Sequence, residues 1–278
     1  MAFAERSPAI LAVMAALILA ETLWRLQSRR GYDGRTALAT LGLMLGNMPF
    51  AALNALLLGA VFGTLWSITP LRLPLDRGVT WVAGFLCVEF AYYWFHRASH
   101  RIRWMWATHS VHHSAGQLTL LSSFRLGWTN LLSAGWIFYA PLVLAGFHPV
   151  LVFGLLAFNL RYQFFLHTEA VGRLGPIEWI FNTPAHHRLH HASNDVYLDR
   201  NYGGVLIIFD RLFGTLAVDQ PGEAPRYGLA HRKPSHNPIA LALGEWRSMV
   251  HDAIRARDWR GVLRALFAPP GKERGDPA

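Results

Sequence analysis

The sequence HRASHRIRWMWATHSVHH at His96–His113 and the sequence HHRLHH at His186–His191 hold nine of the chain's 14 histidines, and His167 lies between them. Residues three or four apart share one face of a helix, with Cβ atoms about 5–6 Å apart. The spacing therefore predicts three helical segments, each turning two or three imidazoles to one side. One metal ion needs only about three to six ligands, so this supply favours a dinuclear site. The ten candidate ligands are His96, His100, His109, His112, His113, His167, His186, His187, His190 and His191.

Long apolar stretches surround these motifs. Only 15% of the residues are charged, against about 25% in a soluble domain. Each stretch approaches or exceeds the roughly 20 residues that span a bilayer. The second is long enough to be tilted or kinked near Asn47–Pro49, with a hairpin as the alternative, and the last two are expected to form a helical hairpin. The five candidate spans are Pro8–Trp24, Ala37–Ile68, Val79–Phe95, Trp128–Phe147 and Val150–Phe165.

The expected fold is an all-α integral membrane protein with about four to five transmembrane helices. A cytosolic helical cap would enclose the histidine-rich dimetal site. We expect an N-terminal transmembrane region over 1–78, whose first apolar run is a retained anchor, and a catalytic core over 79–215. A C-terminal cytosolic region over 216–278 completes the chain. Within it, Pro238–Phe267 has apolar residues at helical spacing, which predicts either an amphipathic helix pair on the bilayer surface or a solvated pair packed on the cap. The tail from Pro269 onward is expected to be disordered.

The net charge of +9 is distributed in a way that indicates topology. Arginines gather in the loop Arg25–Arg35 and in the region after residue 168, so the positive-inside rule places both regions, and with them the histidine motifs, on the cytoplasmic side. Contact with anionic headgroups accounts for the remaining basicity, so no nucleic-acid partner is expected. The single cysteine, Cys87, lies within a candidate span, which excludes a disulfide framework and a thiolate metal cage.

Residue chemistry leaves the metal open, because imidazole suits zinc, copper, iron and nickel. The HExxH pattern of zinc hydrolases is absent. A cluster beside hydrocarbon is arranged for oxidation of a C–H bond, which needs a redox metal and O2, so iron is favoured. A membrane zinc hydrolase remains an alternative. So does a non-enzymatic metal-binding or metal-transporting protein, although transport would require histidines or acids along the spans. His148, His231, His236 and His251 fit no metal-binding pattern.

The motifs resemble the fatty acid hydroxylase/sterol desaturase superfamily over roughly residues 80–215. The last two matching segments look closest to its alkylglycerol monooxygenase-like and bacterial sterol desaturase-like branch. The matching segments are Glu89–His100 (EFAYYWFHRASH), Trp106–Ser114 (WATHSVHHS), Tyr162–Glu169 (YQFFLHTE) and Leu174–Phe213.

The resemblance implies two iron ions (Fe2+/Fe3+), O2 as cosubstrate and hydroxylation or desaturation of a lipid, whether fatty acyl, sterol or ether lipid. It assigns the histidines above as ligands, with His186 the weakest member. Glu89, Glu169 and Asn182 are expected to orient ligands, and for Glu89 the alternative is a buried acid paired inside the bundle. No cytochrome b5-like domain is recognisable, so we expect a separate electron donor such as a reductase, ferredoxin or cytochrome b5-like protein. The expected location is a bacterial inner membrane, crossed several times.

Overall fold

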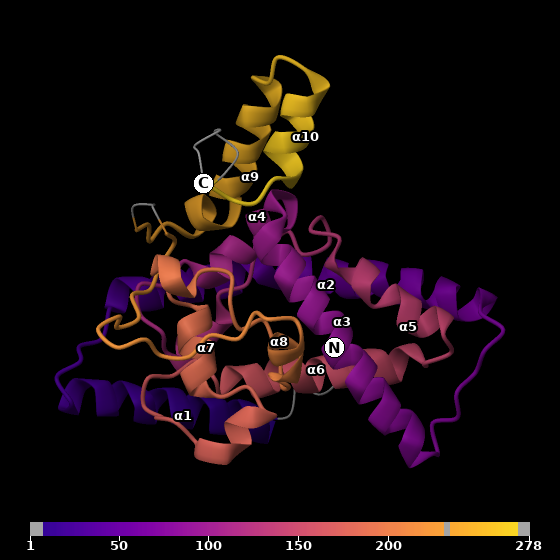
Figure 1. Cartoon of the computed structure of the whole chain (residues 1–278), viewed down its shortest axis with the longest axis horizontal. Coiled ribbons are helices and arrows are strands. Elements are labelled where there is room, and N and C mark those ends of the chain that lie inside the picture. The colour runs from indigo at the N-terminus through magenta and orange to yellow at the C-terminus, as the bar shows by residue number, and fades with distance from the viewer. Residues whose placement is uncertain (1–7, 231–233, 272–278) are drawn as a thin grey trace.

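The computed structural model describes residues 8–230 and 234–271, and this part of the chain is helical (Figure 1). It has no strand beyond two isolated bridges, Phe181 with Leu206 and Ala192 with Tyr227. The prediction of an all-α fold is therefore confirmed. His231 and most of the predicted disordered tail lie outside the described residues. The α-helices are α1 (Pro8–Gln27), α2 (Gly34–Ile68), α3 (Gly78–Arg101), α4 (Arg103–His113), α5 (Ala140–Leu144), α6 (Pro149–Phe164), α7 (Pro184–His190), α8 (Ile208–Leu212), α9 (Pro238–Ile254) and α10 (Trp259–Phe267).

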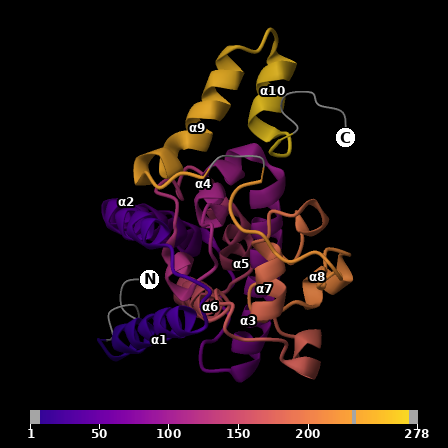
Figure 2. The ribbon, with the colours of Figure 1, turned by 90° about the vertical axis from the view of Figure 1, so that its left-hand side faces the viewer.

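Helices α1 and α2 are both long and apolar enough to cross a membrane. Only 11% and 6% of their most apolar windows are buried, so neither is the core helix of a soluble domain. Figures 1 and 2 show them along the same flank of the molecule. Both features are those of membrane-spanning helices. Helix α2 continues through Pro49 as one element of 35 residues, so the alternative of a hairpin is wrong.

The stretch Trp128–Phe147 does not form the continuous helix that we expected. Turns are followed by a short 3-10 helix (Gly135–Phe138) and by α5. Ala134 adopts a left-handed conformation with φ of 59°, and Gly135 lies where a Cβ would be 2.3 Å from the Phe95 ring. The apolar composition of this stretch therefore does not predict where its helix is interrupted. The following helix α6 is regular, and His148 caps it by accepting a hydrogen bond from the Val150 N–H at 3.1 Å.

One apolar core joins α2, α3, α5 and α6, with Phe62, Val88, Val143 and Leu151 fully buried at its centre. The approach of α3 to α6 is close, because a Cβ on Gly84 would lie 2.6 Å from Leu151. At the far end of this bundle the Leu73 N–H donates to the Gly146 carbonyl at 2.9 Å. Because α3 and α6 run in the same direction from there, their last residues bring His96, His100 and His167 toward one another.

Helices α9 and α10 lie next to α4, which carries three of the histidines (Figure 2). The predicted helix pair forms as α9 and α10, and α9 packs across both α4 and the first turns of α2. Arg103, at the start of α4, is fully buried, and its guanidinium donates to Glu245 at 2.9 Å and to Asp252 at 2.8 Å, both on α9. Removing one partner of a buried ion pair leaves an uncompensated charge. Arg103 therefore locks the ligand-bearing helix α4 to α9.

Arg103→Ala is expected to lower the free energy of unfolding by about 3–5 kcal/mol, because Glu245 would lose this buried partner. The control is Arg173→Ala, which removes one side of the exposed pair with Asp219 and should cost at most about 1 kcal/mol. Thermal unfolding in detergent micelles measures both. Equal shifts in Tm for the two variants would contradict the proposed lock.

Candidate metal centre

Nine histidines gather in two adjoining groups. In each group the candidate ligand nitrogens all lie within 4.8 Å of one another. Two ligands on opposite sides of one ion are about 4.2 Å apart when metal–nitrogen bonds are about 2.0–2.1 Å. Each group therefore has nearly the dimensions of one coordination shell. We call the first group site A, formed by His96, His100, His109, His113 and His190. We call the second site B, formed by His112, His167, His187 and His191.

The repeated HxxHH pattern explains how one helix serves both sites. In α4, His109 and His113 belong to site A, and His112 belongs to site B. In α7 and its C-cap the arrangement is reversed. His187 and His191 belong to site B, and His190 belongs to site A. Residues i and i+4 lie close on a helix face, whereas the residue at i+3 is displaced by about 100° from its neighbour at i+4. Two such helices facing each other can thus enclose two ions.

Backbone carbonyls determine which nitrogen faces each site. Nδ1 of His96, His167 and His190 lies 2.7–2.9 Å from a carbonyl oxygen. Because a carbonyl only accepts, each Nδ1 carries the proton and each Nε2 of the neutral ring offers a lone pair. These Nε2 atoms point into the sites. That of His96 lies 3.0 Å from His109 Nε2, and that of His167 lies 3.1 Å from both His112 Nε2 and His187 Nε2.

Two site A histidines leave a buried nitrogen without a partner among the described residues, namely His100 Nε2 and His190 Nε2. A buried polar atom without a partner is costly, and converging lone pairs repel. A metal ion in site A would satisfy both atoms at once, and an ion in site B would take the lone pair that His167 Nε2 turns inward. The residues present therefore fit a pair of metal ions with nitrogen ligands.

The segment Asp199–Gly203 accepts hydrogen bonds from two of the five histidines of site A and lies close to a third. The Tyr202 carbonyl accepts from His96, the Arg200 carbonyl accepts from His190, and the Asp199 carboxylate lies 3.8 Å from His100 Nδ1. Asp210 fixes this segment because its carboxylate accepts from the N–H groups of Tyr202 and Gly203 at 2.8 and 2.7 Å. Sequence analysis missed Asp210, because its role depends on a contact that no local sequence pattern reveals.

Among the described residues, Glu89 and Asn182 form no hydrogen bond with a histidine, and they bind the backbone of residues 203–206, at the end of this segment and just after it. One Glu89 oxygen accepts from the N–H groups of Val205 and Leu206 at 2.8 and 3.0 Å, and the other accepts from Asn159 at 2.6 Å. The Asn182 side chain donates to the Gly203 carbonyl at 2.6 Å. The expectation of direct contact with a ligand is thus replaced by an indirect role, and the alternative for Glu89, a buried acid paired inside the bundle, describes its contacts.

Glu169, two residues after His167, forms an ion pair with Arg25 of α1 at 2.5 Å. Glu21, one turn earlier on α1, accepts from the Leu120 N–H at 2.7 Å and from the Thr168 hydroxyl. Helix α1 therefore clamps the residues that directly follow the ligand His167. The sequence carried one signal of this clamp, namely a lone acid in an otherwise apolar helix.

Several histidines lie outside both sites. His186 is a buried residue of the ligand-bearing helix α7 but belongs to neither group. His251 is exposed and lies 3.4 Å from Asp252, and His236 lines a surface pocket. In the two sites, His109 and His112 are the half-buried members, whereas the other seven are buried. The edge shared by His109 and His112 is therefore the accessible side of the centre.

Burial keeps the cluster neutral. It lowers the pKa of His112 to about 4 and that of His190 to about 3. For His113, His187 and His191, burial and the neighbouring imidazoles lower the pKa well below its usual value. Neutral imidazole is the form that binds metals, so these rings are prepared as ligands at pH 7.

Comparison with known proteins identifies the segment that carries the centre. The fatty acid hydroxylase family matches residues 81–215, which include all nine histidines. Alkylglycerol monooxygenase from Homo sapiens is 46% identical over 207 residues, covering 74% of this chain and 45% of that protein. Its counterpart from Xenopus tropicalis is 35% identical over 255 residues, covering 91% and 56%.

A bacterial relative, an ornithine lipid hydroxylase from Rhizobium tropici, is 32% identical over 134 residues, covering 48% of this chain and 40% of that protein. The chain spans about half the length of the curated relatives it matches. No solved structure matches it.

The two sites can be distinguished by metal content. His113→Ala removes a ligand of site A and His187→Ala removes one of site B, so each variant should lose about one of two bound ions per chain. His251→Ala and His186→Ala should keep both ions. Elemental analysis of protein purified in detergent gives the ratio. A loss in His186→Ala equal to that in His187→Ala would show that the grouping is wrong.

The metal-free protein should lose stability in acid. Folded His112 and His190 stay neutral until about pH 4 and about pH 3, whereas unfolded histidine takes up a proton near pH 6.5. Below pH 6.5 the unfolded chain binds more protons, so the free energy of unfolding falls as pH is lowered from 6.5 towards 4. Thermal unfolding of chelator-treated protein at pH values from 6.5 to 4 measures this loss of stability. A Tm that stays constant or rises would contradict the neutral cluster.

Proposed function

Because residues 81–215 place this chain in the fatty acid hydroxylase family, we propose that it is a membrane-bound oxygenase that hydroxylates or desaturates a lipid with O2 and external electrons. The single observation that carries the proposal is the pair of adjoining histidine sites within that segment. The names of the relatives, alkylglycerol monooxygenase and ornithine lipid hydroxylase, support lipid oxidation.

We propose that sites A and B each hold one iron ion through histidine nitrogen alone. When bound, two iron ions supply the activation of O2 that attack on an unactivated C–H bond requires. The chain's own residues prepare this site in three ways. Carbonyls of Arg200, Tyr202 and Gln163 hold protons on Nδ1 and aim Nε2 inward, burial excludes water, and the edge between His109 and His112 leaves one side open to the substrate.

The proposed substrate is a lipid with a long alkyl or acyl chain that reaches the centre from the bilayer. Alkylglycerol monooxygenases among the relatives favour an ether lipid over a fatty acyl lipid or a sterol. The proposed topology adds α3 and α6 to the spans α1 and α2, with the histidine end and α9–α10 on the cytoplasmic side of a bacterial inner membrane. There a separate electron-donor protein would deliver electrons.

The positions of the carboxylates argue against a zinc hydrolase. Such an enzyme needs an acid beside the metal to activate water. Glu89 instead accepts hydrogen bonds from Asn159 and from two backbone N–H groups. Glu169 forms an ion pair with Arg25. A metal-transporting protein is disfavoured as well, because the nine histidines form one cluster and none lies on α1 or α2.

Lipid mass spectrometry under 18O2 tests the function. Protein in nanodiscs of bacterial lipid, supplied with iron and a reductase–ferredoxin pair, should insert one 18O atom into a lipid or remove two hydrogens from it. His112→Ala should lower turnover by at least about 100-fold, as expected when a metal site is damaged. His251→Ala, whose ring is exposed, should stay within about twofold. Full activity in a protein stripped of metal would overturn the proposal.

A further inference from the structure

We propose that the α9–α10 hairpin is an anchor that lies in the plane of the membrane surface and binds anionic phospholipid headgroups. This inference depends on the membrane location of the chain and not on the proposed oxygenase chemistry.

Helix α10 exposes its large apolar residues instead of burying them. Trp259, Leu263 and Phe267 recur every four residues and are 67%, 45% and 51% exposed. The opposite face buries Ala265, a small residue, against the rest of the hairpin. Arg260 and Arg264 lie beside the exposed stripe. A stripe of aromatic and aliphatic side chains next to arginines is typical of a helix at the boundary between headgroups and acyl chains.

Helix α9 presents a second exposed apolar stripe. Ile239, Leu243, Val250 and Ile254 are 61%, 41%, 47% and 80% exposed. Exposed apolar area of this extent is unusual on a surface that faces only water. Of these apolar residues, Val250, Ile254 and Trp259 flank the turn between α9 and α10.

The charge of the hairpin selects an anionic surface. Its acids are engaged within the protein, because Glu245 and Asp252 bind Arg103 and Asp258 caps α10 through the Gly261 N–H at 2.7 Å. Each arginine close to an anionic membrane strengthens the electrostatic attraction between the hairpin and that membrane. This attraction falls off within about a Debye length. The basic residues of the hairpin are Arg247, Arg255, Arg257, Arg260 and Arg264.

The packing of α9 places the hairpin at the level of the membrane surface. Leu241 and Ala242 of α9 pack on Ala39 and Leu43, in the first turns of the candidate membrane helix α2. Figures 1 and 2 show α9 and α10 rising steeply across the direction of α2. A hairpin held at the end of a spanning helix and directed across it runs along the bilayer surface.

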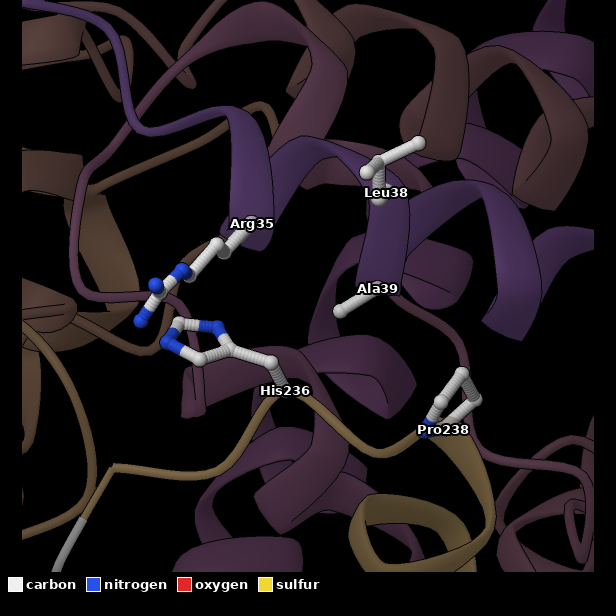
Figure 3. A pocket seen from close by; sticks show the side chains of 5 residues that line it. All are labelled: Arg35, Leu38, Ala39, His236 and Pro238. Carbon is white, nitrogen blue, oxygen red and sulfur yellow. The ribbon is translucent and has the colours of Figure 1, made fainter.

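A pocket at this junction has the composition of a headgroup site (Figure 3). Its volume is about 340 Å³, and Leu38, Ala39 and Pro238 supply an apolar floor. In Figure 3 the guanidinium of Arg35 extends toward the ring of His236 at its edge. A guanidinium matches the geometry of a phosphate, and an acyl chain fits the apolar floor beside the exposed Leu38. One phospholipid seated here would continue the surface formed by α9.

Hydrogen exchange of the full chain in nanodiscs tests the anchor. Peptides over 250–267 should exchange more slowly in phosphatidylcholine mixed with phosphatidylglycerol than in phosphatidylcholine alone. Arg260→Gln/Arg264→Gln should lower the protection gained from phosphatidylglycerol by roughly tenfold. Arg77→Gln/Arg173→Gln, which removes the same charge elsewhere, should leave it unchanged.

A second measurement uses Trp259 as a depth probe. Brominated phosphatidylglycerol should quench the tryptophan fluorescence of the unsubstituted protein more than that of the Trp259→Phe variant. This difference should disappear when Arg260→Gln/Arg264→Gln is also present. Equal exchange in both nanodiscs together with no Trp259 quenching would overturn the inference. So would protection that follows protein concentration and not lipid charge, because a second copy of the chain would then be the occupant. Neither readout requires catalytic turnover. Both therefore test the anchor even if the protein shows no oxygenase activity.

Discussion

The structure depends on bringing nine neutral imidazoles together with their lone pairs facing inward. His96 Nε2 turns its lone pair toward His109 Nε2, 3.0 Å away, and buried His100 Nε2 and His190 Nε2 have no partner among the described residues. An apolar core cannot compensate for that cost, because burial only makes an unsatisfied polar group more expensive. Two metal ions remove the conflict, and the rest of the fold keeps the rings in place for them.

That support comes from three directions and from residues far apart in the chain. Asp210 and Glu89 brace the segment whose carbonyls hold His96 and His190. Glu21 and Arg25 on α1 clamp the residues that follow His167, and Arg103 fastens α4 to α9. Each support acts on a backbone or a helix and not on the metal. A mutation in any of them would misalign ligands without deleting one.

The sequence predicts the ligands better than it predicts their supports, for a physical reason. From the HxxHH spacing we expected His109, His112 and His113 to share one helix face, and His187, His190 and His191 another. Their division between sites A and B depends on how α4 faces α7, and His186 falls outside for the same reason. Glu169 forms an ion pair with Arg25, 144 residues away, a contact that local sequence does not predict. The apolar run Trp128–Phe147 indicated burial but not its interrupted backbone, because turns and spans can have similar composition.

Iron K-edge X-ray absorption of the purified, reconstituted protein is the most direct test of the central claim. Two ions held in sites A and B predict a first shell of nitrogen at about 2.0–2.2 Å with the multiple scattering of imidazole rings, together with two iron atoms per chain. A single ion per chain, or a shell dominated by carboxylate oxygen or sulfur, would contradict the account.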